Sequence, residues 1–445
     1  MNHFHVFSRI AFQSPRAALA LALVAVGCAG ENSMEIAAEQ LGQAEGALLL
    51  PPATCQDIRN ANPGAVDSTY VLHIDNDHAK PWRAYCHNMA SAPAEYVTLQ
   101  NVGPSANVSQ YNANGMPGST VTTQYARVRI DPATLLVDIS DQTFATSSGQ
   151  LTHGSETVTS MPFGVAMSCD ASPSGAANID LTGTPFAVAA GEFLQGGTGS
   201  SGGSATYSSD DQIVDITGGG YCGWTCASPA TFNPFNDTGT FQLDLVYRAP
   251  ASCADIKAIL PNAGNGTYTL FVDHDEAKPW KAHCHNMATA PAEYLSLPNV
   301  GPGANFSQYT ASGNGTNVRT RYSKVRIDPA TLLVDISDQT FTTSSGQLTH
   351  GSETVTSMPF GVAMSCNNAP SGVGNIDLTG TPFAVATGEF LQGGTNGAGS
   401  AVYSSNDRVV ALTGGGFCGW TCASPATFNP FNDAGDFQLD LVYAP

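Results

Sequence analysis

The chain has 445 residues, of which 42% are hydrophobic and only 12% are charged, so it has enough apolar residues to fold and lacks the high charge of a disordered protein. It contains 36 acidic residues against 16 Lys and Arg, which gives a formal charge of −20. An acidic surface repels phosphate groups, so this composition argues against nucleic acid as a partner.

The N-terminal segment has the features of an export signal. Its apolar run, Ala17–Gly27, follows two arginines and is too short to remain as a membrane-spanning helix. The run leads into Cys28 through Ala-Val-Gly, which is similar to the lipobox of bacterial lipoproteins. We therefore expect residues 1–27 to be a signal peptide and 28–52 to be a lipidated cysteine and tether. If Cys28 is not lipidated, the alternative is a fully secreted protein.

A long internal duplication organises the rest of the chain. Val128–Cys169 recurs at Val325–Cys366 with one difference in 42 positions. A repeat of this length at a fixed offset identifies two copies of one folding unit. We place the first domain at 53–249 and the second at 250–445, each of ordinary domain size and able to bury its own core.

Each repeat is expected to open on a short helix and to continue in strands. Helical sequence follows Cys55 and Cys253, and a proline, Pro63 or Pro261, ends it. Segments rich in β-branched and aromatic residues then predict strands. In the first repeat these are Thr69–Ile74, Tyr96–Leu99, Ala126–Ile130, Leu135–Ile139, Phe186–Ala189, Gln212–Thr217 and Phe241–Tyr247.

Alternation in the last of these segments predicts a half-buried antiparallel strand, with Leu243 and Leu245 on its inner face. The sequence contains no long amphipathic helix. The predicted fold class is therefore mainly β, α+β at the margin. It consists of two tandem repeats of one disulfide-containing antiparallel β domain, each with a short N-terminal helix.

The 11 cysteines indicate a disulfide framework, since matched cysteines in an exported chain usually pair. Each repeat contains five cysteines, so one cannot pair within its own repeat. The alternatives for this fifth cysteine are a buried thiol, a disulfide to the other repeat, or a metal ligand together with His87 or His285. Our hypothesis is that each Cys-Gly-Trp-Thr-Cys loop uses one cysteine within its repeat and the other for the sister repeat. The ten cysteines are Cys55, Cys86, Cys169, Cys222, Cys226, Cys253, Cys284, Cys366, Cys418 and Cys422.

Few residues have the pattern of a catalytic or metal site. The sequence contains no His-Glu-x-x-His motif, which a zinc metalloprotease needs. His153 and Glu156 lie close together, but in a segment rich in Gly, Ser and Thr. Acidic clusters that could bind calcium are more typical of solvated turns, and we expect no cofactor, with zinc or calcium as the alternatives. The acidic candidates are Asp75, Asp77, Asp273 and Asp275.

The four tryptophans occupy matched positions in the two repeats. Trp82 and Trp280 follow Lys-Pro, whereas Trp224 and Trp420 lie between the two closing cysteines. Tryptophan usually packs in a core, but an indole inside a five-residue cysteine loop is hard to bury completely. All four are candidates for a binding surface, with Trp224 and Trp420 favoured.

The order of these landmarks resembles the GON domain, the C-terminal module of some ADAMTS metalloproteases. The matching features are the cysteine that opens a helix, Gly266–Leu270, Cys86–Met89, Ser323–Asp328 and the closing Gly-Gly-Gly-x-Cys-Gly. This family has more cysteines in its animal members, and Leu151–Ser160 looks like an addition to the pattern. The resemblance implies a module that is an appendage to a catalytic domain, which this sequence does not contain.

The opening of each repeat is also similar to the opening of fibrinogen-like domains, whose two corresponding cysteines are bonded. That resemblance implies the disulfides Cys55–Cys86 and Cys253–Cys284. We therefore expect a non-catalytic binding or adhesion protein of the cell envelope, anchored to a membrane by lipid, with an extracellular or envelope protein or glycan as partner. The alternative, implied by the family alone, is a zinc-binding activity associated with metalloendopeptidases.

Overall fold

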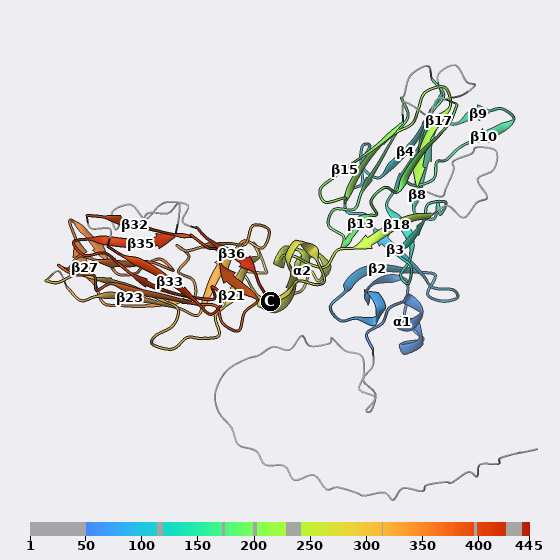
Figure 1. Cartoon of the computed structure of the whole chain (residues 1–445). Coiled ribbons are helices and arrows are strands. Elements are labelled where there is room, and N and C mark those ends of the chain that lie inside the picture. The colour runs from blue at the N-terminus through green and yellow to red at the C-terminus, as the bar shows by residue number, and fades with distance from the viewer. Residues whose placement is uncertain are drawn as a thin grey trace, which may run out of the picture. The chain divides into compact units, whose positions relative to one another are not determined.

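The computed structural model describes residues 50–113, 118, 120–170, 174–198, 203–227, 242–313, 315–395, 398–423 and 438–445. Within these ranges the two repeats contain the same succession of a short helix, a 3-10 turn and many short strands (Figure 1). The fold is mainly β, as the sequence predicts. Cys28 and the rest of the N-terminal segment lie outside the described residues.

A capped helix opens each repeat: α1 (Cys55–Ala61) and α2 (Cys253–Ile259). The hydroxyl of Thr54 accepts a hydrogen bond from the amide of Asp57, and the Asp57 carboxylate accepts one from the amide of Thr54 at 2.9 Å. This reciprocal pair is a capping box, which satisfies amides that have no partner within the helix. Ser252 and Asp255 form the same box at α2.

Among the described residues, the first sheet of each repeat has seven strands, and every neighbouring pair in it is antiparallel. Its order in the first repeat is β1 (Ser68–His73), β2 (Pro81–His87), β3 (Ala94–Thr98), β6 (Arg127–Asp131), β7 (Leu136–Asp138), β18 (Gln242–Tyr247) and β13 (Phe186–Val188). The second repeat has β19 (Gly266–Phe271), β20 (Pro279–His285), β21 (Ala292–Ser296), β24 (Lys324–Ile327), β25 (Leu333–Asp335), β36 (Gln438–Tyr443) and β31 (Phe383–Val385).

The second sheet of each repeat has nine strands in the part of the chain that the structure describes. In the first repeat these are β14 (Phe193–Gly197), β17 (Gly223–Ala227), β11 (Ala166–Ser168), β4 (Val108–Asn112), β12 (Ala176–Asp180), β16 (Ile213–Thr217) and β15 (Ser204–Ser208), with β5 (Val121–Tyr125) and β8 (Ala145–Ser148) continuing from β4. Their counterparts are β32 (Phe390–Gly394), β35 (Gly419–Ala423), β29 (Ala363–Ser365), β22 (Phe306–Thr310), β30 (Val373–Asp377), β34 (Val409–Thr413), β33 (Ser400–Ser404), β23 (Val318–Tyr322) and β26 (Thr342–Ser345).

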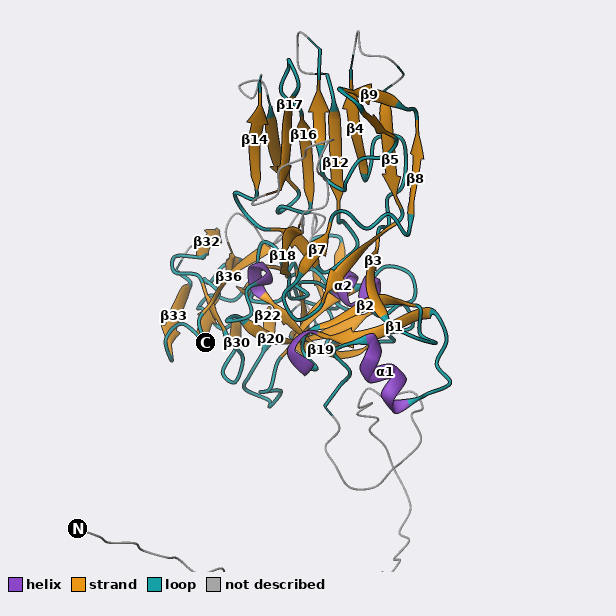
Figure 2. Ribbon diagram, turned by 90° about the vertical axis from the view of Figure 1, so that its right-hand side faces the viewer, coloured by secondary structure: helices purple, strands orange, loops and turns teal. Residues whose placement is uncertain are grey.

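One pairing in the nine-stranded sheet is parallel, β4 with β11, and its counterpart is β22 with β29. A separate two-stranded hairpin, β9 (Leu151–His153) and β10 (Glu156–Val158), recurs as β27 (Leu348–His350) and β28 (Glu353–Val355). In the first repeat the nine-stranded sheet lies at one end and the seven-stranded sheet, with α1, at the other (Figures 1 and 2). Among the described strands, the prediction of antiparallel sheets is therefore correct for every pairing except this one in each repeat.

Each repeat packs its own hydrophobic core. One cluster of buried side chains runs from Cys55 to Leu245 and the other from Cys253 to Leu441. Leu243 and Leu245 are buried, which confirms the alternation expected for β18. All seven segments that the sequence predicts to be strands in the first repeat contain one. The remaining strands are short, and several of them are rich in Ser, Thr and Gly.

Candidate functional site

The candidate site lies where three strands of the nine-stranded sheet end together. Strands β4 and β11 run parallel, and Tyr111 near the end of β4 pairs with Met167 of β11. Cys169 follows β11 immediately, and Cys222 directly precedes β17, which runs antiparallel to β11. The topology therefore brings Tyr111, Cys169 and Cys222 to the same end of the sheet. Figure 2 shows the hairpin strand β9 at this end, away from α1.

Four side chains meet there, and we call them the tyrosine–histidine–disulfide cluster. Cys169 and Cys222 form a disulfide. The hydroxyl of Tyr111 lies 2.9 Å from Sγ of Cys169 and also contacts Nδ1 of His153. Nδ1 of His153 is 4.0 Å from Sγ of Cys169. Three residues far apart in the sequence thus surround one sulfur atom.

The second repeat builds the same cluster from Tyr309, His350, Cys366 and Cys418. The hydroxyl of Tyr309 lies 2.8 Å from Sγ of Cys366, and Nδ1 of His350 lies 3.8 Å from it. The two repeats are nearly identical in sequence here, so the same fold builds the same cluster in both of them. This recurrence is not independent support for a function.

The β9–β10 hairpin positions the imidazole. His153 is the last residue of β9 and pairs with Glu156 across a turn in which Gly154 has a φ of +62°. Glycine adopts this left-handed conformation without the penalty that a Cβ atom brings. The sequence indicates a loop rich in small polar residues, whereas the structure forms a short hairpin that directs His153 toward the disulfide.

Burial keeps both polar groups of the cluster uncharged at neutral pH. It raises the pKa of the Tyr111 hydroxyl and lowers the pKa of the His153 imidazole. In the second repeat it raises the pKa of Tyr309 to about 12 and lowers that of His350. A disulfide sulfur has no proton to donate. The tyrosine hydroxyl therefore donates its proton to Nδ1 of the neutral imidazole.

The turn before β17 exposes an aromatic side chain beside the cluster. Tyr221 and Cys222 have positive φ values of 53° and 65°, and the amide of Tyr221 donates to the carbonyl of Asp170 at 2.6 Å. Non-glycine residues hold this conformation only where their surroundings fix it, which the disulfide and this hydrogen bond do. Tyr221 is 63% exposed, and its counterpart Phe417 is 52% exposed.

A family comparison identifies the repeats. The model of the GON domain matches residues 52–116, 114–233 and 310–428, which together make up more than half of the chain. The chain belongs to the GON domain family. The resemblance seen in the sequence is thereby confirmed in both repeats.

One curated relative shows where such a module occurs. It is "A disintegrin and metalloproteinase with thrombospondin motifs gon-1" of Caenorhabditis elegans, 25% identical over 199 residues. The match covers 38% of this chain and 9% of that protein, so the similarity concerns a small part of the relative. No solved structure matches the chain.

The structure shows which cysteines of each GON repeat form disulfides and which one is left over. Cys55–Cys86 and Cys253–Cys284 are both present, as the fibrinogen-like resemblance implies. The fifth cysteine of each repeat, Cys226 or Cys422, is a buried thiol with 0% exposure. The hypothesis of a bridge between the repeats is therefore wrong, because strand β17 or β35 directs this side chain into the core of its own repeat.

The tryptophans differ in exposure from what the sequence suggests. Trp82 and Trp280 are 0% and 3% exposed, so their indoles form part of the two cores and are not available to a partner. Trp224 is half-buried, since its indole lies against Gly196 on β14, where an added Cβ would be 1.9 Å from the ring. Trp420 lies against Gly393 in the same way.

Sequence reasoning missed Tyr221 and Phe417, two exposed aromatic residues of this region. The available signal was their position between three glycines and a cysteine, a place where a side chain has little to pack against. The favoured residue, Trp224, lies on the strand that follows and packs on its neighbour. The candidate for a binding surface is therefore Tyr221, three residues before Trp224 and directly before the disulfide cysteine.

The acidic residues proposed as metal ligands belong to surface turns. Asp75 lies 3.6 Å from the Lys80 ammonium, and Asp273 lies 3.0 Å from that of Lys278. Asp275 is 3.7 Å from the same Lys278. A lysine that already neutralises the carboxylates competes with a cation, which favours the solvated turn over calcium.

Of the other proposed ligands, His87 and His285 are the last residues of β2 and β20, and Asp77 lies in the turn before β2. Asp77 accepts a hydrogen bond from the amide of Ala79 at 2.8 Å, as in an Asx turn. Nδ1 of His87 is 3.0 Å from the Asp67 carboxylate, and His285 neighbours Asn265 at 3.5 Å. Among the described residues, these side chains do not join any group of three potential ligands.

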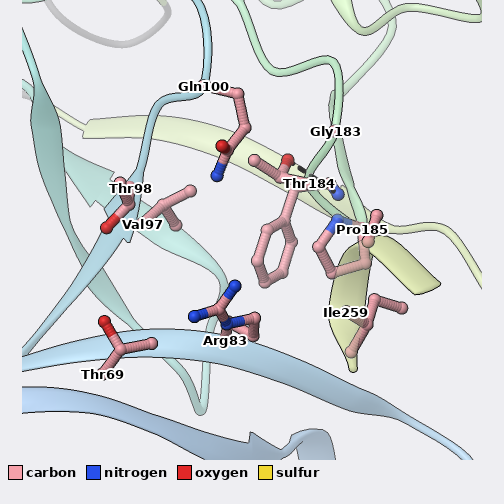
Figure 3. A pocket seen from close by; sticks show the side chains of 11 residues that line it. Thr69, Arg83, Val97, Thr98, Gln100, Gly183, Thr184, Pro185 and Ile259 are labelled. Atoms are coloured by element: carbon pink, nitrogen blue, oxygen red, sulfur yellow. Dashed lines mark hydrogen bonds between the residues drawn. The ribbon is translucent and has the colours of Figure 1, made fainter. Parts of the chain in front are cut away.

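A pocket lined mainly by residues of the first repeat, together with Ala258 and Ile259 of α2, contains few reactive groups. Arg83 of β2, Val97 and Thr98 of β3 and Thr184 form part of its wall (Figure 3). Arg83 is the one ionisable side chain among the described residues that line it. An active site normally gathers several ionisable groups, so this pocket gives no support to an enzymatic role.

Proposed function

We propose that the protein is an exported, non-catalytic binding or adhesion protein, in which each GON repeat presents an aromatic tip to an extracellular or envelope protein or glycan. The observation that carries the proposal is the exposure of Tyr221 and Phe417, 63% and 52%, on turns anchored by a disulfide. A large aromatic ring on a rigid turn binds a partner with little loss of conformational entropy.

Two further observations support a binding role. The described part of the chain places its histidine–cysteine groups around disulfides, whose sulfur atoms are not nucleophilic thiolates. The chain also repeats the tip, and two tips on one chain increase the apparent affinity for a partner that both can reach. No helix among the described residues is long and apolar enough to cross a membrane.

The test replaces both tip residues. In the Tyr221→Ser, Phe417→Ser variant we expect binding to weaken by at least roughly 10-fold, because exposed aromatic residues dominate many interfaces. Biolayer interferometry of the full chain against immobilised extracellular glycans and matrix proteins measures this effect and separates the two kinds of partner.

A matched variant controls for the loss of exposed apolar surface. Val246 and Val442 are each 45% exposed on the seven-stranded sheets, so Val246→Ser with Val442→Ser removes apolar area away from the tips. Binding should be unchanged in this control. Equal binding by the tip variant and the unmodified chain would disprove a role for the tips.

Export and lipid anchoring form the second part of the proposal. Four disulfides in the described residues are typical of proteins that fold in an oxidising compartment. Lipidation at Cys28 would attach the chain to a membrane, with residues 28–52 as tether. We expect Cys28→Ala to move the protein from the detergent phase to the aqueous phase in a phase-partition assay of expressing bacteria. An unchanged distribution would exclude Cys28 as the anchor.

A further inference from the structure

The tyrosine–histidine–disulfide cluster contains the donor atoms of a transition-metal site. Nδ1 of His153, Sγ of Cys169 and Sγ of Cys222 all lie within 4.8 Å of one another, and His350, Cys366 and Cys418 match them. In a tetrahedral zinc site with Zn–S bonds of about 2.3 Å and Zn–N bonds of about 2.1 Å, neighbouring ligand atoms are separated by roughly 3.5–3.8 Å. One ion can therefore reach all three atoms after small side-chain rotations.

The chemistry of the donors selects the class of metal. Two thiolates and an imidazole favour zinc and other thiophilic ions over calcium or magnesium, which prefer oxygen ligands. The side chains of His153, Cys169 and Cys222 are all partly exposed, so an ion can enter from solvent. The Tyr111 hydroxyl, 2.9 Å from Cys169, is placed to be a fourth ligand or to donate a hydrogen bond to a thiolate.

We propose that each GON repeat has two alternative clamps at this end of the nine-stranded sheet: the disulfide seen here, and a zinc ion held by His153, Cys169 and Cys222 when the disulfide is reduced. The second repeat uses His350, Cys366 and Cys418. The two clamps exclude each other, because the thiolates that bind the ion are the sulfurs that form the bond. Either one joins the ends of the same segment, which spans 53 residues in the first repeat.

The conversion balances as a thiol–disulfide exchange. A dithiol reductant transfers two electrons and two protons to the Cys169–Cys222 bond and leaves as its own disulfide. Zinc then displaces two protons from the thiols as the two Zn–S bonds form. No other oxidant or reductant is needed.

Exposure determines which disulfide reacts first. Cys55 and Cys86 are both 0% exposed, whereas Cys169 and Cys222 are partly exposed. Exchange requires attack on an accessible sulfur, so a dithiol at low concentration should open Cys169–Cys222 and leave Cys55–Cys86 closed. The same difference holds between the two disulfides of the second repeat.

The test uses the full chain, reduced with limiting dithiothreitol and freed of it by gel filtration without oxygen. Added zinc is titrated against a chromophoric chelator, and cobalt in its place reports thiolate ligation through its charge-transfer absorption. We expect two ions to bind per reduced chain and none to bind the oxidised chain. Mass spectrometry after alkylation should label Cys169 and Cys222 but not Cys55 and Cys86.

Variants in one repeat use the other repeat as an internal reference. His153→Ala should reduce the tightly bound ions from two to one and halve the cobalt charge-transfer band. His87→Ala and Cys226→Ala, which lie outside the cluster, should still bind two. Two tight ions in the His153→Ala chain, or no tight ion in the reduced unmodified chain, would overturn the proposal. Circular dichroism of each oxidised variant verifies that it has folded.

Discussion

Replacing Cys55 and Cys86 by alanine is expected to destabilise the first repeat by about 4 kcal/mol. The disulfide joins residues 31 positions apart, and both cysteines are fully buried where α1 meets strand β2. On the chain-entropy model, removing a link across about 30 residues gives the unfolded chain freedom worth roughly 3–4 kcal/mol, and the lost packing of buried sulfur adds to it. A domain of this size should melt about 10 °C lower.

Differential scanning calorimetry of the full chain measures this change, and the second repeat, with its own core, is the reference. The transition of the altered repeat should move while that of the other stays. Cys226→Ala is the matched control, since it removes a buried sulfur that belongs to none of the four disulfides in the described residues, and it should cost only about 1 kcal/mol. An equal effect of the two changes would mean that packing, and not the cross-link, stabilises this region.

The sequence predicts the first sheet better than the second. Strand β1 is rich in β-branched and aromatic residues, and β18 alternates apolar with polar residues, which places Leu243 and Leu245 in the core as expected. Strands β5, β8 and β15 are short and contain few large apolar residues, so their sequences lack the hydrophobic alternation that marks a half-buried strand. Tertiary pairing, not local propensity, decides that these segments are strands.

The site could be predicted only in part. The cysteines are recognisable, yet the Cys169–Cys222 pairing depends on the antiparallel contact of β11 with β17, which brings together segments more than 50 residues apart. His153 enters the cluster through a three-residue strand too short for any periodic signal. The spacing of the two closing cysteines predicts an exposed loop around Trp224, whereas the structure forms a strand there and packs the indole on Gly196.

The junction of β11 with β12 suggests a second change with a large effect. Strand β4 pairs its last residues with β11 and its first residues with β12, so these two strands divide one side of β4 between them. At this junction a Cβ added to Gly175 would lie 1.9 Å from the carbonyl oxygen of Met167. A backbone atom cannot move aside as a flexible side chain can. We therefore expect Gly175→Ala to cost about 3 kcal/mol or more.

The position of Gly175 connects this cost to the candidate site. Its carbonyl accepts a hydrogen bond from the amide of Gly218 at 3.0 Å, and Met167 lies two residues before Cys169. If the strands separate in Gly175→Ala, calorimetry will show a lower transition for the first repeat, and Cys169–Cys222 will become easier to reduce. Gly103→Ala is the control, since its Cβ would have no atom within 4 Å and the change should be nearly neutral. A stable Gly175→Ala repeat with unchanged reduction would show that β11 can shift without loss, and that the cluster does not depend on this close approach.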